Sequence, residues 1–225
     1  MQNIFKNIQI HVNEHIYLRD PLETSLGKNI IRGSVVMIDE LGFEDFTFKK
    51  LSQSIQTTEA SIYRYFENKH KLLTYLTAWH WGIMLHRLYF SIANLKTAEE
   101  KLERAILLIT DPVYEDTDAF QINEAKLYHL IVKESSKSYL TRMVDEENKA
   151  GFFQPYKNFV GEVSKLILEI NPAYAYPHML VSTCIEGVYH QRYFASHLPS
   201  LTDKANNADT IHLFYKDLIF RAIRD

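Results

Sequence analysis

Apolar residues recur at helical spacing through most of the chain. Over residues 30–41 they form one face that ends at Gly42, a residue suited to ending a helix. A second short helix is predicted over 48–55 with Thr47 as its N-cap, and a third begins after Thr58. Short helices joined by a tight turn and followed by a long helix are typical of a helix-turn-helix DNA-binding unit.

The rest of the chain also reads as helices, which predicts an all-α fold. We predict them over 69–93, 98–110, 118–133, 138–149, 155–170, 172–197 and 208–223. Pro177 lies inside the pattern over 172–197, so this helix either begins at Pro177 or is kinked there. Near the N-terminus, Ile8, Ile10 and Val12 alternate with polar residues, which indicates a short strand or an extended arm. This arm either packs on the protein, which we favour, or reaches DNA through Lys6, His11, His15 and Arg19.

The net charge and the single cysteine limit how the protein could bind DNA and which sites it could carry. The net charge of −3 excludes bulk basicity as a source of DNA affinity, so any such affinity must come from a local patch. Basic residues do cluster near the predicted turn, diluted by acidic ones: Lys28, Arg32, Lys49, Lys50, Arg64, Lys69 and Lys71. Cys184 is the only cysteine and is expected to be buried and inert rather than a redox or ligand site. No apolar run approaches a membrane span, and the N-terminal residues lack the apolar core of a signal peptide, so we expect a cytoplasmic protein.

Nothing in the sequence favours catalysis. The ten histidines do not form a metal-binding motif, and His190 and His197 share a helix face but stand ~10 Å apart along its axis. There is no glycine-rich phosphate loop and no nucleophile elbow. We therefore expect no catalytic residues, no metal and no cofactor.

The segment from Leu41 to Leu73 resembles the TetR/AcrR family of one-component transcriptional regulators. The similarity lies in the runs Leu41-Gly42-Phe43, 46–51, 58–66 and 68–73. One departure is Gln56, where the family's turn usually has glycine. The resemblance implies an N-terminal three-helix DNA-binding domain joined by a long helix to a helical ligand-binding and dimerisation domain. We place an arm at 1–24, the DNA-binding domain at 25–68 and the second domain at 69–225.

The resemblance also implies partners: double-stranded DNA with a palindromic operator, a small-molecule effector and a second copy of the chain. Repression is the default role that it implies. On this basis we predict that Thr47, Tyr63, Tyr65 and Lys69 hold phosphates, and that Thr57, Glu59, Ala60 and Arg64 lie nearest base edges, with Lys49, Thr58 and Ser61 beside them. The alternative is a helical binding or scaffold protein that has lost DNA affinity.

The second domain offers candidate effector and dimer contacts. Large aromatic and sulfur side chains in the middle helices either fill a core or line a pocket. Six candidates for that pocket are Trp79, Met84, His86, Tyr128, His129 and Phe159. The apolar arcs of the last two helices are wider than one contact needs, which predicts a homodimer through 175–224. Its predicted interface residues are Leu180, Cys184, Val188, Phe214, Leu218 and Ile219.

Overall fold

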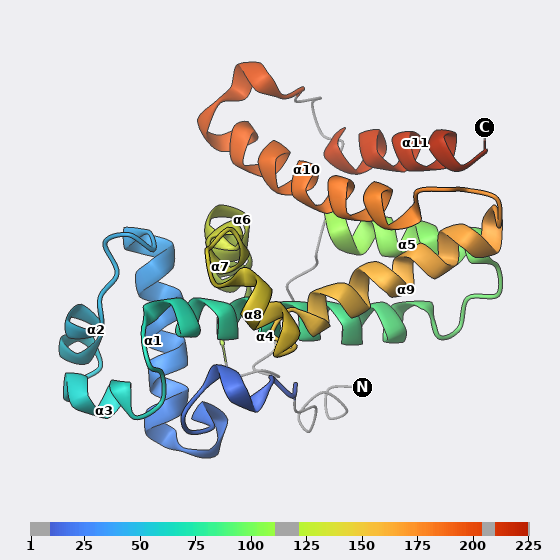
Figure 1. The fold of residues 1–225 in the computed structure, drawn as a ribbon. Helices are drawn as coiled ribbons and strands as arrows, with labels where there is room; N and C mark the ends of the chain where they lie inside the picture. Colours follow the sequence, from blue (N-terminus) through green and yellow to red (C-terminus); the bar gives the residue numbers. More distant parts are fainter. Residues whose placement is uncertain (1–9, 111–121, 204–209, 225) are drawn as a thin grey trace. The chain divides into compact units, whose positions relative to one another are not determined.

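A computed structural model describes residues 10–110, 122–203 and 210–224, and helices are the only regular elements in these ranges (Figure 1). The all-α prediction is confirmed. The α-helices are α1 Ser25–Leu41, α2 Phe48–Ser54, α3 Glu59–Tyr63, α4 Lys69–Ile92, α5 Ala98–Thr110, α6 Glu124–Glu134, α7 Ser136–Tyr139, α8 Val144–Lys149, α9 Gln154–Ile170, α10 Pro177–His197 and α11 Thr210–Arg224. Short 3₁₀ turns lie at Glu14–Ile16, Pro21–Glu23 and Pro199–Leu201.

The chain divides into two compact units. The first combines Met1–Gly82 with Tyr114–Pro155, so that α6, α7 and α8 belong with the helix-turn-helix region. The second combines Ile83–Val113 with Tyr156–Asp225 and contains α5, α9, α10 and α11. The predicted boundary between residues 68 and 69 stays a prediction.

Side-chain caps set the ends of the first three helices. Thr24 accepts a hydrogen bond from the Gly27 amide at the start of α1, and Thr47 and Thr58 do the same for α2 and α3. Gly42 ends α1 with φ of 80°, a conformation in which glycine avoids the Cβ clash. The roles of Gly42, Thr47 and Thr58 confirm the sequence prediction. The small core beneath them is fully buried and consists of Ile30, Ile31, Ile38, Phe46, Leu51, Ile62 and Phe66.

The described part of the N-terminal segment packs on the first unit. Ile10, Val12 and Ile16 are buried, which confirms packing, while residues 10–13 have no regular structure where a strand was one expectation. Ile10 lies so close to Gly82 on α4 that a Cβ at position 82 would overlap its side chain. Lys6 and Ile8 lie outside the described residues.

One helix prediction needs correction, and one alternative left open by the sequence is decided. The segment 138–149 is not one helix but α7 and α8, because Leu140 leaves the helical region at φ −82° and ψ 59°. This polar segment has no continuous apolar stripe to hold one long helix against a core. Helix α10 begins at Pro177, which confirms one of the two alternatives for this proline, and the Asn171 side chain accepts from the Ala173 amide in the turn before it.

The remaining ends agree with the sequence prediction within a few residues. A reciprocal capping pair, Thr97 with Glu100, starts α5 as predicted. Helix α6 begins after Asn123, which caps it, and the earlier predicted start at 118–121 lies outside the described residues. The same holds for positions 208 and 209 before α11. In the described ranges, no helix is long and apolar enough to cross a membrane.

Candidate nucleic-acid interface

The turn between α2 and α3 is built around one left-handed residue. Gln56 has φ of 53°, and among the described residues it is the only one other than glycine with positive φ. The Thr57 amide then reaches back to the carbonyl oxygen of Ser52 at 2.9 Å, which closes the turn. A side chain at this φ costs roughly 1–2 kcal/mol relative to an ordinary backbone conformation. With Gln56 in place of the family's usual glycine, the turn therefore still forms, but its backbone is strained at this residue.

Helix α3 carries a short chain of polar contacts. The hydroxyl groups of Thr58 and Ser61 lie 2.8 Å apart, and Arg64 Nη2 donates to Ser61 Oγ at 3.1 Å. These bonds hold the Arg64 guanidinium against the helix while its residue stays exposed. The Tyr63 ring packs edge-on against Phe48 at 5.0 Å, which joins α3 to α2. The polar end of α3 is thus ordered before any partner binds.

Most residues predicted to contact DNA lie at the surface of this unit. Thr47, Lys49, Thr58, Ala60, Tyr63 and Arg64 are exposed, and Thr57, Glu59 and Lys69 are half-buried. Ser61 is buried and acts within the helix. The structure therefore brings the predicted base-edge residues and several predicted phosphate contacts onto neighbouring elements.

Tyr65 has a different place from the one predicted. Its side chain is 3% exposed and its hydroxyl lies 2.7 Å from Thr24 Oγ1. The Arg19 guanidinium lies 5.6 Å from the centroid of the Tyr65 ring. The Tyr65 carbonyl oxygen accepts a hydrogen bond from the Leu18 amide at 2.8 Å. These contacts make Tyr65 a link between the N-terminal segment and the end of α3, and it carries no phosphate contact in our account.

Lys69 also has an internal role. Its ammonium donates to the carbonyl oxygens of Phe43 and Glu44 at 3.0 Å each, and lies 3.4 Å from that of Phe46. It also lies 4.8 Å from the centre of the Phe43 ring. These bonds satisfy the carbonyl groups of the α1–α2 loop, which leaves the ammonium half-buried at the edge of the surface.

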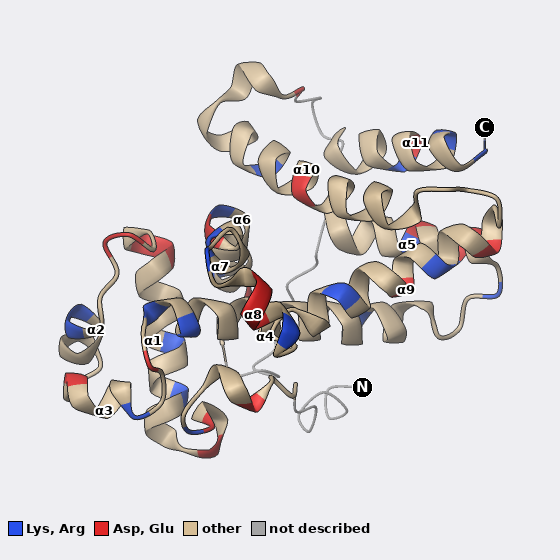
Figure 2. Cartoon of the chain, in the orientation of Figure 1, with Lys and Arg blue, Asp and Glu red and all other residues tan. Residues whose placement is uncertain are grey.

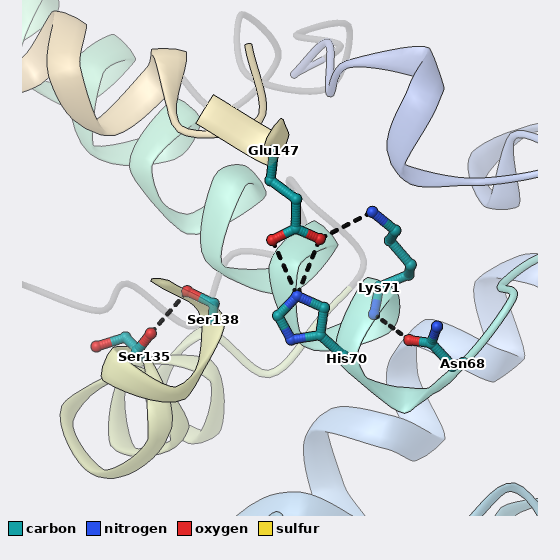
Figure 3. A network of polar contacts seen from close by, with 6 residues as sticks. All are labelled: Asn68, His70, Lys71, Ser135, Ser138 and Glu147. Carbon is teal, nitrogen blue, oxygen red and sulfur yellow. Dashed lines mark hydrogen bonds and ion pairs between the residues drawn. The ribbon is translucent and has the colours of Figure 1, made fainter. Parts of the chain in front are cut away.

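A second polar network braces the start of α4 (Figure 3). Glu147, whose side chain is 4% exposed, receives His70 Nε2 at 3.0 Å and Lys71 Nζ at 2.8 Å. Asn68 caps the same turn by accepting from the Lys71 amide at 2.9 Å. Sequence reasoning missed Glu147 and also the buried Glu134 of α6. The signal for Glu134 was its spacing from Leu127, Leu130 and Ile131, which places a carboxylate on an apolar face.

Charged residues of both signs lie around this unit (Figure 2). Acidic side chains lie at the C-terminal end of α1 and in the α1–α2 loop, and several are paired with lysines of α6 and α7. Lys49 on α2 and Arg64 after α3 remain exposed beside the turn. The surface beside the turn therefore carries charges of both signs, since Glu59 opens α3 and Glu67 is exposed after it.

The predicted pocket residues fall into both units. Trp79, Tyr128 and His129 belong to the first, in which Trp79 and Tyr128 are buried and His129 is exposed. Met84, His86 and Phe159 belong to the second, in which Met84 and Phe159 are buried and His86 is half-buried. Within the described ranges, no group of three or more histidine, cysteine, aspartate or glutamate residues is arranged to hold a metal ion.

The predicted dimer residues also divide into two sets. Cys184, Val188 and Ile219 are buried within their own unit, where α10 packs on α11. Phe214 and Leu218 are 56% and 40% exposed, and Leu180 is half-buried. Other large apolar side chains are exposed along or beside α10 and α11, namely Tyr176, Met179, Tyr193 and Leu213. The two helices thus use one apolar face internally and present another outward.

Solved structures share this fold at low sequence identity. AibR in complex with isovaleryl coenzyme A and operator DNA is 14% identical, with a TM-score of 0.55 over 86% of this chain and 97% of its own. A putative transcriptional regulator from Saccharomonospora viridis in complex with choline is 15% identical, with a TM-score of 0.60 over 88% and 97%. The superantigen PfiT is 13% identical, with a TM-score of 0.56 over 90% and 97%.

At these identities the structures establish the fold alone. No curated protein sequence matches the chain. The family evidence comes from residues 30–76, which match the family described as "Bacterial regulatory proteins, tetR family". That segment contains most of α1, the whole of α2 and α3 and the start of α4. The resemblance to the TetR family of bacterial regulatory proteins is therefore confirmed for residues 30–76.

Proposed function

We propose that the protein is a homodimeric, sequence-specific DNA-binding regulator that represses transcription until a small molecule releases it. The observation that carries this proposal is the surface of α2, the turn and α3, on which Thr47, Ala60, Tyr63 and Arg64 stand exposed on capped, ordered helices. A regulator of this kind has no catalytic role and works in the cytoplasm.

Base recognition is assigned to the exposed end of α3. Arg64 can donate two hydrogen bonds to a guanine edge, and Ala60 can contact a thymine methyl group. Thr57 and Glu59 stand beside them, where Glu59 can accept from a cytosine amino group. Thr47, Lys49 and Tyr63 hold phosphates and set the register of the helix in the major groove. Lys69 lies near enough to add a phosphate contact, although its main bonds are internal.

The homodimer is supported by the exposed apolar side chains of α10 and α11. A dimer makes one isologous interface from this face, with each copy contributing the same residues. Light scattering should give twice the chain mass of 26.4 kDa for the wild type at micromolar concentration. Phe214→Glu with Leu218→Glu should give a folded monomer, while Leu140→Glu, also on an exposed leucine, should leave the dimer intact. A monomeric wild type, or a double variant that stays dimeric, would rule out this interface.

The small-molecule effector in this proposal is supported by two neighbours of the same fold whose structures hold isovaleryl coenzyme A and choline. A second candidate function is a helical binding protein without DNA affinity. It is favoured by the strained Gln56 in the turn and by the low net charge. Its fold is shared by a superantigen, so the fold alone does not separate the two functions.

Selection from a library of random duplexes separates them. A dimeric regulator should enrich a two-fold symmetric sequence whose half-sites are centred about 34–36 Å apart or a multiple of that spacing. Mutating Lys69 and Tyr63 together, to Ala and Phe, should weaken binding to selected and random duplexes alike. A library that shows no enrichment would favour the binding protein instead.

A further inference from the structure

The backbone of the α1–α2 loop, residues 42–46, is held by two charged side chains from different helices. Lys69 of α4 binds carbonyl oxygens of the loop, as described above. Glu134 of α6 binds a backbone N–H group of the loop, because Glu134 Oε1 accepts from the Phe43 amide at 3.0 Å. The loop leads directly into Thr47, the cap of α2. Its position therefore determines where α2 begins.

Glu134 is the buried member of a small charge cluster. It is 7% exposed, and its Oε2 lies 2.9 Å from Lys137 Nζ as an ion pair rather than a well-directed hydrogen bond. Lys137 also binds the Glu44 carboxylate at 2.8 Å and lies 5.9 Å from the Phe43 ring centre. The hydrogen bond to Glu44 raises the pKa of Lys137, so this ammonium stays charged. The cluster thus joins α6 and α7 to both the backbone and a side chain of the loop.

Other contacts between α6 and α1 are weaker candidates for this role. Lys126 pairs with Glu40 at 2.7 Å and Lys133 with Asp39 at 3.6 Å, but the lysine side chains in both pairs are about a third exposed. Exposed ion pairs contribute little and tolerate small movements. The hydrogen bond from a backbone N–H to a buried carboxylate is short and directional. Leaving such a carboxylate without its donor costs free energy of folding. Glu134 is therefore the contact that is sensitive to small movements of the loop.

We propose that Glu134 is a positioning residue for DNA binding, which holds the α1–α2 loop so that Thr47 and α2 are placed to contact the phosphate backbone. This inference rests on the proposed DNA-binding function. It makes the junction of α6 and α7 part of the DNA-binding apparatus, although neither helix carries a DNA contact. A movement of this junction that withdraws Glu134 would free the loop and lower DNA affinity.

The sign of the effect separates this role from simple electrostatics. Removing a carboxylate near a DNA-binding surface reduces repulsion with phosphates, so electrostatics alone predicts tighter binding. The positioning role predicts weaker binding from the same change. Glu134→Gln keeps an oxygen that accepts from the Phe43 amide but loses the ion pair with Lys137. It should therefore recover part of what Glu134→Ala loses.

The test compares wild type, Glu134→Ala, Glu134→Gln, Lys137→Met and the control Glu169→Ala, an exposed glutamate of α9. Amide hydrogen exchange at Phe43 reports the state of the loop without DNA, and anisotropy titration with a duplex enriched by selection reports affinity. Circular dichroism and a cooperative thermal transition show which variants are folded. Should Glu134→Ala fail to fold, Glu134→Gln and Lys137→Met still test the cluster.

We expect Glu134→Ala to speed exchange at Phe43 at least tenfold and to weaken DNA binding about tenfold. Glu134→Gln and Lys137→Met should give smaller losses, and Glu169→Ala should match the wild type. Unchanged or tighter DNA binding in Glu134→Ala, with the wild type binding well, would overturn the positioning role alone. A wild type that shows no preference for any duplex would overturn the proposed function and this inference with it.

Discussion

The hydroxyl group of Tyr65 lies 2.7 Å from that of Thr24, the residue that caps α1. The start of the first helix is thereby tied to the chain just after α3. Tyr65→Phe should lower the free energy of unfolding by about 1 kcal/mol, because the buried bond is lost. This corresponds to a fall in Tm of roughly 2–4 °C for a chain of this size.

The same variant tests whether Tyr65 touches DNA. A tyrosine that donates to a phosphate would, when lost, weaken binding to every sequence without changing Tm. We expect the opposite, a lower Tm with DNA affinity reduced less than twofold. Thr24→Val should lower Tm further, since it removes both this bond and the cap on the Gly27 amide. A Tm equal to the wild type in Tyr65→Phe would contradict the structural role.

The left-handed Gln56 provides a stabilising substitution. At φ of 53° a glycine avoids the strain that a Cβ imposes, although it loses more chain entropy on folding. Gln56→Gly should therefore raise the free energy of unfolding by about 0.5–1 kcal/mol, measured by urea denaturation. Gln56→Ala serves as the control, since it keeps a Cβ and should give no gain. A destabilised glycine variant would mean that the Gln56 side chain contributes more than its backbone strain costs.

The contact of Glu147 with His70 and Lys71 should be a main source of stability in the first unit. Glu147→Ala leaves a lysine and a histidine without their buried acceptor, so we expect a loss of roughly 2 kcal/mol. Thermal unfolding should show a Tm lower by about 4–8 °C. Glu146→Ala, on the exposed neighbouring residue, should leave Tm unchanged within a degree or so. Equal effects from the two variants would mean that the network of Figure 3 contributes nothing specific.

Cys184 should make the protein sensitive to alkaline pH. Burial raises the pKa of its thiol from 9.0 to about 12, so the folded state keeps a proton that the unfolded state releases. Because the unfolded state then binds fewer protons, the free energy of unfolding falls as pH rises from 9 towards 12. Burial also raises the pKa of Tyr215 to about 12, which adds to the fall.

Two measurements check the state of this thiol. Cys184→Ala should show a shallower loss of stability between about pH 9 and pH 11 than the wild type, as measured by urea denaturation. At pH 8 a thiol reagent should modify the native protein at least about a hundredfold more slowly than the protein in denaturant. Rapid stoichiometric modification of the native protein would show that the thiol is accessible and would support a redox role.

Local signals made the helices of the DNA-binding unit predictable. Gly42, Thr47 and Thr58 act on the residues next to them, so their effect can be read from a short stretch of sequence. The same holds for the capping pair at Thr97 and Glu100. The break at Leu140 was not predictable in this way, because a polar segment with weak periodicity takes its shape from distant contacts.

The side-chain roles at the site depended on such distant contacts. Tyr65 and Thr24 are far apart in sequence, and so are Phe43 and Glu134. Their pairing follows from how α1, α4 and α6 pack, which periodicity does not specify. The sequence therefore indicated which residues surround the turn. It also predicted phosphate contacts for Tyr65 and Lys69, whose described contacts are internal.

The proposed function requires that the surface of α2, the turn and α3 reads a DNA sequence. Its most direct test is an anisotropy titration of the wild type with the selected duplex and with a scrambled duplex of the same composition, at equal salt. We predict at least about a hundredfold preference for the selected duplex. Arg64→Ala should reduce that preference about tenfold or more, whereas Lys49→Ala should weaken both complexes equally. Equal affinity of the wild type for the two duplexes would rule out sequence-specific recognition by this surface.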